Sequence, residues 1–358
     1  MTEAPEVLFE RRGSIGIITL NRPKALNALT TGMCAAIDGS LRDWGRDPAV
    51  RAIITRGTGG RAYCAGGDVR AVAESGARRK AGDDDGLTRD FFRTEYRMNR
   101  RLQRFEKPLI ALIDGVTMGG GIGLSMHGSH RVATERTLAA MPETGIGLFP
   151  DVGASYVLPR LPGAFGLYLA LTGARLGAAD LAHLGMATDV IESARLDDLV
   201  DALVAAEWNA GEARAVTDGV LKTFRVAPTA APLAEHKDVI DACFALDTVE
   251  AILAALDKTP GAFASETAAT IRTMSPTSCK ISHEEMRRGR DLSFDDCMRM
   301  EYRLTQSVLA DHDFYEGIRA LLIDKDKQPK WKPATLAEVG DVARYFAAPA
   351  DGDLTFED

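Results

Sequence analysis

The sequence predicts an α/β fold, because strands and helices alternate along its first half and helices dominate its second half. Two isoleucine-rich segments, 14–20 and 51–56, have the length and composition of buried strands. The segment between them, 30–44, is predicted to be a helix. Apolar side chains recur there at helical spacing, at Met33, Ile37, Leu41 and Trp44.

The remaining elements continue this alternation up to about residue 163. A strand at 109–114 leads through a run of glycines into a short helix that ends near His127. Further short strands are expected at 131–133 and 138–140, and amphipathic helices at 196–206, 249–256 and 294–309. We therefore expect an α/β core over residues 1–191 and a helical C-terminal region over residues 192–358. The charged, glycine-containing segment 75–86 is predicted to be a mobile loop.

Charge and composition narrow the class of protein. The chain has 358 residues and a formal net charge of -8, from 43 basic and 51 acidic side chains. An acidic balance argues against nucleic-acid binding, which requires a basic surface, although local basic clusters can still hold a phosphorylated ligand. No apolar stretch approaches the length of a membrane span, so a membrane partner is not expected.

The cysteines and the N-terminus bear on the compartment. The five cysteines are scattered, odd in number and without a CxxC pair, which favours free thiols over disulfides or a zinc site. The first twelve residues carry three glutamates and no apolar core, unlike a secretion or organelle-targeting peptide. We therefore expect a cytoplasmic protein with no metal site.

The first motif that is a candidate for a chemical role is Tyr63–Asp68, of sequence YCAGGD. Its small residues let the backbone approach a ligand closely, and a helix is expected to begin near Asp68. An N–H group at such a helix start carries partial positive charge. The alternative is a tight turn between strand and helix that Asp68 caps.

The second motif, Val116–Gly121, follows a buried strand and opens a helix. It lacks the Lys-Ser/Thr pair of a phosphate-binding P-loop, and it does not sit at the first strand as a dinucleotide fingerprint would. Two N–H groups, one from each motif, can converge on a single carbonyl oxygen. The two motifs together therefore predict an oxyanion hole.

The third motif, Met141–Gly153, places two carboxylates eight residues apart among glycines and apolar residues. Burial would raise the pKa of Glu143 and suit it to base chemistry near neutral pH. The alternative for Glu143 is that it caps a turn, and for Asp151 that it caps the helix that follows. The apolar context favours a functional Glu143, whereas both interpretations of Asp151 stay open.

These motifs resemble those of the crotonase (enoyl-CoA hydratase/isomerase) superfamily, and the resemblance covers nearly the whole chain. It implies a spiral of ββα units with a helical C-terminal region. Segment 21–29, NRPKALNAL, is similar to the signature that holds the nucleotide end of coenzyme A. By this resemblance, Gly67 and Gly120 supply the two oxyanion-hole amides. The residues implied to contact the substrate or its coenzyme A are Arg22, Lys24, Ala25, Leu26, Ala65, Gly66, Asp68 and Gly119.

Within the superfamily, segment 141–161 is similar to the 3-hydroxyisobutyryl-CoA hydrolases, as are C-terminal segments that include 275–278, 300–304 and 312–333. The implied reaction is hydrolysis of a short 3-hydroxyacyl-CoA in valine breakdown. Glu143 would attack the carbonyl and give a mixed anhydride, or activate a water, and both routes stay open. Asp151 would bind the 3-hydroxyl or shuttle a proton. Coenzyme A arrives with the substrate, no metal or redox cofactor is implied, and the superfamily often forms trimers.

One departure from the superfamily pattern separates the alternatives. The hydratases use two glutamates, one corresponding to Glu143 and the other to position 123, where this chain has Gly123. An enoyl-CoA hydratase or isomerase on the same scaffold is the main alternative, and Gly123 argues against the hydratase. A non-catalytic acyl-CoA-binding or RNA-associated member is the second alternative. It would predict a lost Glu143 or a basic surface, and the sequence has neither.

Overall fold

The computed structural model describes residues 4–356, and internal contacts divide the chain into two compact units. The first unit comprises the chain up to Gly67 together with Arg97–Ala139 and Arg175–Ala234. The second comprises Asp68–Tyr96, Ala140–Ala174 and the chain from Glu235 onward. The domain boundary expected near residue 191 remains a prediction. The two expected regions also include residues 1–3 and 357–358, which lie outside the described residues.

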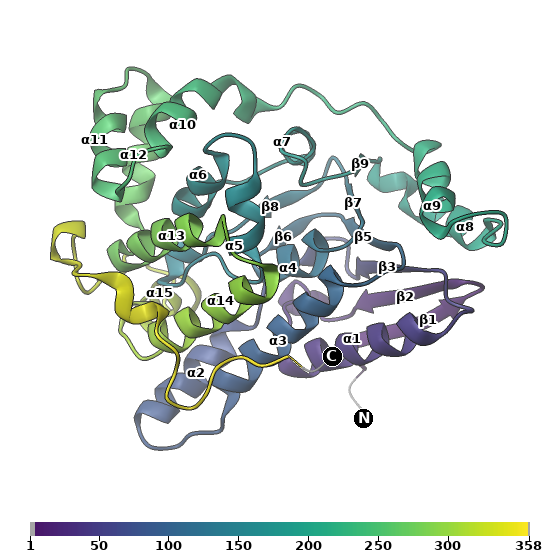
Figure 1. Ribbon diagram of the computed structural model, residues 1–358, viewed down its shortest axis with the longest axis horizontal. Helices are drawn as coiled ribbons and strands as arrows, with labels where there is room; N and C mark the ends of the chain where they lie inside the picture. Colours follow the sequence, from purple (N-terminus) through teal and green to yellow (C-terminus); the bar gives the residue numbers. More distant parts are fainter. Residues whose placement is uncertain (1–3, 357–358) are drawn as a thin grey trace. The chain divides into compact units, whose positions relative to one another are not determined.

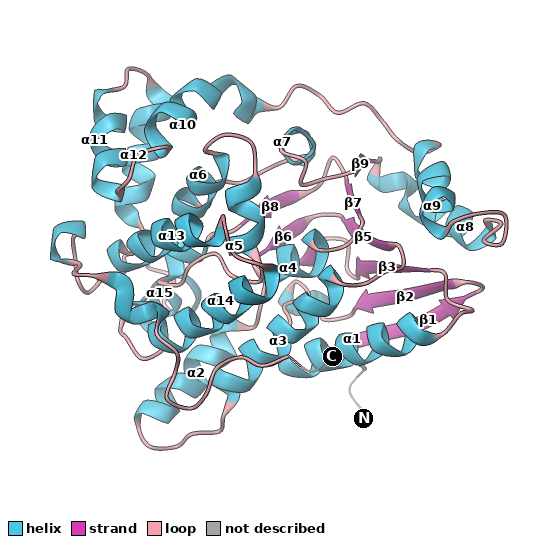
Figure 2. Ribbon diagram, viewed as in Figure 1, coloured by secondary structure: helices cyan, strands magenta, loops and turns pink. Residues whose placement is uncertain are grey.

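The first unit contains a six-stranded sheet in the order β1-β2-β3-β5-β7-β9 (Figures 1 and 2). β1 is antiparallel to β2, and every later neighbour pairs in parallel. Parallel strands require crossover connections, which the helices between them provide. The strands are β1 (Val7–Arg12), β2 (Ile15–Leu20), β3 (Ala52–Gly57), β5 (Leu109–Ile113), β7 (His130–Ala133) and β9 (Asp189–Val190).

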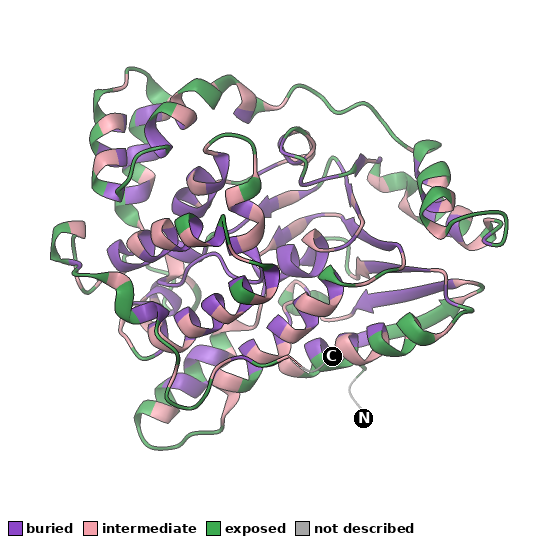
Figure 3. Ribbon diagram, in the orientation of Figure 1, coloured by how far each residue is buried: buried purple, intermediate pink, exposed green. Residues whose placement is uncertain are grey.

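The apolar strands explain why this sheet is buried. All six residues of β2 and all five of β5 are buried, as expected for central strands of a parallel sheet (Figure 3). Their side chains pack with helices α8 (Leu196–Ala205) and α9 (Ala213–Lys222) in one core that includes Ile17, Ile54, Ile110, Leu203 and Leu221. Helix α1 (Thr31–Arg46) begins at the Thr30 cap and buries Met33, Cys34, Ile37 and Leu41.

A smaller three-stranded sheet has the order β4-β6-β8, from β4 (Ala62–Cys64), β6 (Val116–Met118) and β8 (Leu138–Ala140). β4 and β6 are parallel, so their carboxyl ends lie at the same edge. Helix α4 (Gly120–Met126) starts directly beyond β6. Two of the three predicted motifs are therefore neighbours at one strand edge.

The second unit is helical. Helix α3 (Leu87–Gln103) contributes its residues up to Tyr96, and helix α5 (Ala154–Val157) follows the segment that carries Glu143 and Asp151. The other helices are α2 (Val69–Lys80), α6 (Phe165–Thr172), α10 (Lys237–Phe244), α11 (Val249–Lys258), α12 (Ala262–Thr273), α13 (Pro276–Gly289), α14 (Phe294–Val308) and α15 (Asp313–Ile318). This unit confirms the helical C-terminal region, and the two units together confirm the α/β class.

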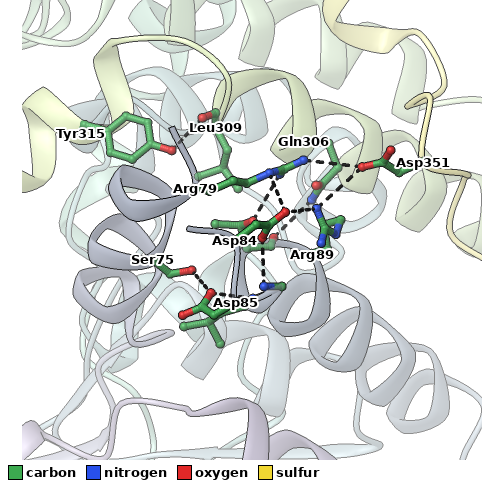
Figure 4. A network of polar contacts seen from close by, with 12 residues as sticks. Ser75, Arg79, Asp84, Asp85, Arg89, Gln306, Leu309, Tyr315 and Asp351 are labelled. Carbon is green, nitrogen blue, oxygen red and sulfur yellow. Dashed lines mark hydrogen bonds and ion pairs between the residues drawn. The ribbon is translucent and has the colours of Figure 1, made fainter. Parts of the chain in front are cut away.

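The prediction of a mobile loop at 75–86 was wrong over its first half. Helix α2 continues to Lys80, and Ser75 and Gly76 are buried, because one face of α2 packs on α15. Only 81–86 forms a connection, and it is held by charge. Asp84 lies between Arg79 and Arg89, which also pair with Asp351 near the C-terminus (Figure 4). Composition alone could not reveal these partners.

Over the described residues, no helix is long and apolar enough to cross a membrane.

Candidate active site

The oxyanion-hole motifs lie side by side in the first unit. β4 ends at Cys64 and β6 at Met118, and the glycines that follow leave the sheet at the same edge. A Cβ added to Gly121 would lie 2.2 Å from the carbonyl oxygen of Cys64, and one added to Gly66 would lie 3.3 Å from that of Met118. The two segments can approach this closely only because they carry no side chains there.

Backbone conformation sets the direction of the two predicted amides. Gly66 has φ 114° and Gly119 has φ 48°, values that residues with a side chain rarely adopt. Each of these glycines directly precedes a predicted donor, Gly67 or Gly120. Gly120 is the first residue of α4, so its N–H is one of the amides that an α-helix leaves without an internal partner. The sequence pattern thus corresponds to a specific backbone shape.

The predicted coenzyme A segment is hydrogen-bonded to this edge. The amide of Ala65 donates to the carbonyl of Leu26 at 3.0 Å, and that of Leu29 donates to the carbonyl of Gly66 at 2.8 Å. Buried Asn27 fixes the loop by donating to the carbonyls of Thr58 and Ala62. The loop bearing Ala25 and Leu26 is therefore part of the same rigid edge as Gly66 and Gly67.

The two basic residues of this segment differ in their surroundings. Arg22 forms an ion pair with Glu6 at 3.0 Å and donates to the carbonyl of Ala28 at 2.7 Å. Lys24 is exposed, on the short 3-10 helix Pro23–Ala25. Lys24 is thus the more accessible of the two to an anionic group, whereas Arg22 also stabilises the loop.

Five buried carboxyl groups of the second unit lie close enough to repel one another. They are Glu143, Asp151, Glu95 on α3, Glu285 on α13 and Glu301 on α14, each at most 5% exposed. No lysine or arginine among residues 4–356 is buried to this extent. Burial without a cation disfavours the charged form, and these acids also repel one another. The cluster therefore holds its protons more tightly than exposed acids do.

Asp151 does not cap a helix. The N-cap of helix α5 is Gly153, which has no side chain to cap with. The Asp151 carboxylate instead accepts a hydrogen bond from the Tyr96 hydroxyl at 2.7 Å. Burial raises the pKa of Asp151 to about 6, and the Tyr96 hydrogen bond limits that rise. Of the two interpretations left open, the capping role is wrong, and Asp151 is held as an acceptor in a buried cluster.

Glu143 is the first residue of a 3-10 turn, Glu143–Ile146, whose N-cap is Pro142 and not Glu143. Its Oε2 is buried and has no hydrogen-bond partner within the protein. Burial, and then repulsion from Asp151, raises the pKa of Glu143 well above its ordinary value. A buried acid with an unsatisfied oxygen is costly to a folded protein, which is typical of groups kept for chemistry.

Sequence analysis missed Glu95, which also has an unpartnered buried oxygen, Oε1. Burial and repulsion from Asp151 raise its pKa in the same way as that of Glu143. A signal was present, since Glu95 lies four residues after Phe91 and three before Met98 on the buried face of α3. An acid on the apolar face of a helix is rarely tolerated without a role. Glu285 and Glu301 occupy equivalent positions on α13 and α14.

The predicted site residues thus fall into two groups. Gly67, Gly120 and the coenzyme A loop belong to the first unit, and Glu143 and Asp151 to the second. Asp68 opens the second unit, where its side chain caps α2 by accepting from the amide of Ala71. Within the described chain, no group of three or more His, Cys, Asp or Glu side chains has metal-binding geometry.

A parallel α/β core with glycine-lined strand ends, joined in one chain to a helical part with buried acids, defines a protein of the crotonase class. The family model described as enoyl-CoA hydratase/isomerase matches residues 15–346. The chain belongs to this family.

Several relatives share nearly the full length of the chain. The 3-hydroxyisobutyryl-CoA hydrolase, mitochondrial, of Rattus norvegicus is 48% identical over 362 residues, which are 99% of this chain and 92% of that protein. The protein of the same name from Homo sapiens is 45% identical over 360 residues, 99% of this chain and 91% of that protein.

Solved structures carry other names. A carnitinyl-CoA dehydratase from Mycobacterium thermoresistibile matches with a TM-score of 0.91 and 42% identity, covering 99% of each chain. An enoyl-CoA hydratase from Rhodobacter sphaeroides matches with a TM-score of 0.87 and 38% identity, covering 98% of this chain and all of that one. The chain is therefore similar in sequence to proteins named for hydrolysis, and similar in structure to proteins named for dehydration and hydration.

Proposed function

We propose that this chain hydrolyses the thioester of a short 3-hydroxyacyl-CoA, with 3-hydroxyisobutyryl-CoA from valine degradation as the first choice. The observation that carries the proposal is the pair Glu143 and Asp151. Glu143 has a buried oxygen without a partner, and Asp151 is held nearby in the same cluster by Tyr96. The names of the relatives that are 45–48% identical support the same choice.

In this proposal the amides of Gly67 and Gly120 donate to the thioester oxygen as it becomes negatively charged. Glu143 in its ionised form either attacks the carbonyl carbon or takes a proton from a water that attacks it. In both routes the C–S bond breaks, the coenzyme A thiolate leaves and takes up a proton, and one water is consumed overall. No step in either route needs a metal or a redox cofactor.

Asp151 supplies selectivity in this proposal by accepting a hydrogen bond from the 3-hydroxyl of the acyl group. A substrate without that hydroxyl would leave a buried carboxylate without its partner, which is costly. An assay of thiol release over a panel of acyl-CoAs tests the function. We expect the 3-hydroxylated thioesters to be cleaved much faster than propionyl-CoA or isobutyryl-CoA. Equal rates across the panel would contradict the proposed substrate class.

The second candidate function is hydration of an enoyl-CoA. It is favoured by the solved dehydratase and hydratase relatives and by Glu95, a second carboxyl in the cluster of Glu143. It is disfavoured by Gly123, which leaves the family position of the second glutamate empty. We expect negligible loss of the conjugated-thioester absorbance of crotonyl-CoA. Rapid loss would favour hydration over hydrolysis.

We also propose a cellular compartment and an oligomeric state for this protein. The five cysteines are buried and form no disulfide among residues 4–356, in line with a reducing compartment such as the cytoplasm. The vertebrate relatives are named as mitochondrial proteins, and these names give the cytoplasm no support over a mitochondrion. The trimer implied by the resemblance predicts a particle of three 38.5 kDa chains, which light scattering measures directly.

A further inference from the structure

The turn that follows Asp151 has an unfavourable backbone conformation. Val152 has φ 55° and Gly153 has φ 91°, so two consecutive residues are left-handed. Glycine adopts such angles freely, but a β-branched residue like valine does not. A strained turn persists only where surrounding contacts hold it, and such turns cluster at functional sites.

Glu301 provides those contacts from α14. Its Oε2 accepts from the amide of Gly153 at 2.8 Å, and its Oε1 accepts from the amide of Ser155 at 3.1 Å and from the Ser155 hydroxyl. Glu301 is fully buried and lies 148 residues away from Gly153 in the sequence. Three donors and no acceptor surround its two oxygens in these bonds, so the hydrogen bonds favour the ionised form, while burial and repulsion from Asp151 raise the pKa of Glu301 to about 8.

Glu301 therefore performs the capping role that Asp151 would otherwise have. The amides of Gly153 and Ser155 lie at the start of α5, where helices need an acceptor. Since Glu301 satisfies them, the Asp151 carboxylate is free to accept from Tyr96 instead. The turn is also fixed from α13, because Gly289 packs so closely that a Cβ there would lie 1.9 Å from the Ser155 carbonyl oxygen.

We propose that Glu301 is a positioning residue for the reaction. By holding the strained turn Asp151–Gly153 from behind, it aims the Asp151 carboxylate at the 3-hydroxyl of the substrate. The inference rests on the proposed function, because it assigns the 3-hydroxyl to Asp151. Glu301 itself touches no substrate and acts only through the turn. Selectivity for hydroxylated acyl groups thus depends on a residue 150 positions downstream in the sequence.

The decisive variant is Glu301→Gln. Glutamine has the same length but only one acceptor oxygen, so its NH₂ group must face either the Gly153 amide or the Ser155 donors. The turn then loses part of its support. We expect the kcat/KM ratio between a 3-hydroxyacyl-CoA and its deoxy analogue to fall roughly tenfold or more. Hydrolysis of the deoxy analogue, which does not need Asp151, should change far less.

Two further variants guard the interpretation. Ser155→Ala removes one of the three donors to Glu301 and should lower the ratio in the same direction by a smaller factor. Glu285→Gln is the matched control, because Glu285 is an equally buried acid of the second unit whose two oxygens have no partner. It should leave the ratio unchanged. If Glu285→Gln lowers the ratio as much as Glu301→Gln, the acidic surroundings are responsible and the positioning role is overturned.

The wild-type protein separates this inference from the proposed function. If it hydrolyses no 3-hydroxyacyl-CoA, or does so without preference for the hydroxyl, the proposed function fails. If the wild type is selective and folded Glu301→Gln is equally selective, only the positioning role fails. Should Glu301→Gln not fold, Ser155→Ala decides, and an unchanged ratio in that variant overturns the inference.

Discussion

The two units supply different kinds of chemical group. In the first unit the candidate groups are backbone amides, which depend on glycines at the ends of two parallel strands. In the second they are carboxyl side chains, brought together from positions between 95 and 301. A backbone site is encoded locally, because it needs glycine wherever a Cβ would collide. A side-chain cluster is encoded by the fold, and no short motif contains it.

The largest effect should come from changing a carboxyl side chain of the second unit. We expect Glu143→Gln to abolish thioester hydrolysis while leaving folding and coenzyme A binding nearly intact, because the change keeps the shape and removes basicity and nucleophilicity. Thiol release measures the first, and binding of a coenzyme A analogue measures the second. A variant that keeps more than roughly a tenth of wild-type turnover would show that Glu143 is not the key group.

The role of the backbone amides of the first unit is tested by Gly121→Ala. The added methyl group would lie 2.2 Å from the Cys64 carbonyl oxygen, so α4 must move away from β4. We expect kcat/KM to fall by about 10²–10³, the loss typical of one oxyanion-hole donor. Gly219→Ala is the control in the same unit, since nothing lies within 4 Å of its added Cβ and it sits within α9. Equal activity in both variants would show that catalysis does not depend on the glycine-rich edge.

Asp151→Asn tests selectivity, the next effect in size. Asparagine keeps the shape but loses the charge, so the preference for hydroxylated over deoxy substrates should shrink by roughly tenfold or more. Had Asp151 been a helix cap, this change would be almost silent, because Asn caps about as well as Asp. The measurement is kcat/KM for both substrates with both proteins, and unchanged selectivity would remove the hydroxyl from the role of Asp151.

Tyr96→Phe refines this test through pH. The hydroxyl favours ionised Asp151, so its loss should raise the pKa of Asp151 above its value of about 6. Selectivity in the variant should then fall on going from pH 8 to pH 6 more steeply than in the wild type. Parallel pH profiles would mean that Tyr96 does not control the charge of Asp151.

The glycine-rich edge was predictable from the sequence, and the acid cluster was so only in part. Motifs 63–68 and 116–121 specified their own backbone shape, and Glu143 and Asp151 stood out among apolar neighbours. Glu301 could not be assigned, because its partners are amides 148 residues away. The charged composition of 75–86 concealed the helix, since its stabilising contacts with Asp351 and Tyr315 are also distant in the sequence.

A separate effect is expected on stability. Burial raises the pKa of Glu285 well above 4.5, so folding takes up a proton whenever the unfolded residue is ionised. Its contribution to stability is therefore highest below pH 4.5 and falls as pH rises toward the folded pKa. Glu285→Gln removes this dependence and should gain up to ~1.4 kcal/mol over the wild type per pH unit within that window. Urea unfolding between pH 5 and 8 measures the difference.

The adjacent Glu284 is the control of opposite sign. Hydrogen bonding to Arg287, then to Arg288, lowers the pKa of Glu284 to about 2. It is therefore ionised in both folded and unfolded chains between pH 5 and 8, and its stabilising contribution is constant there. Glu284→Gln should lower stability by an amount independent of pH in this range. A pH-dependent difference would contradict the assignment of charge to the two neighbours.

The ion pair between Arg79 and Asp351 joins residues 272 positions apart (Figure 4), and this separation bears on the order of folding during synthesis. All three stretches of the first unit have been synthesised by Ala234, whereas the last stretch of the second unit begins only at Glu235. Helix α2 and the start of α3 must therefore wait for nearly the whole chain before Asp351 can pair with them. Contacts so distant in sequence form slowly, and surfaces that wait for them are exposed to aggregation. The glycine-lined edge can thus take shape on the ribosome well before the carboxyl cluster that depends on the C-terminal helices.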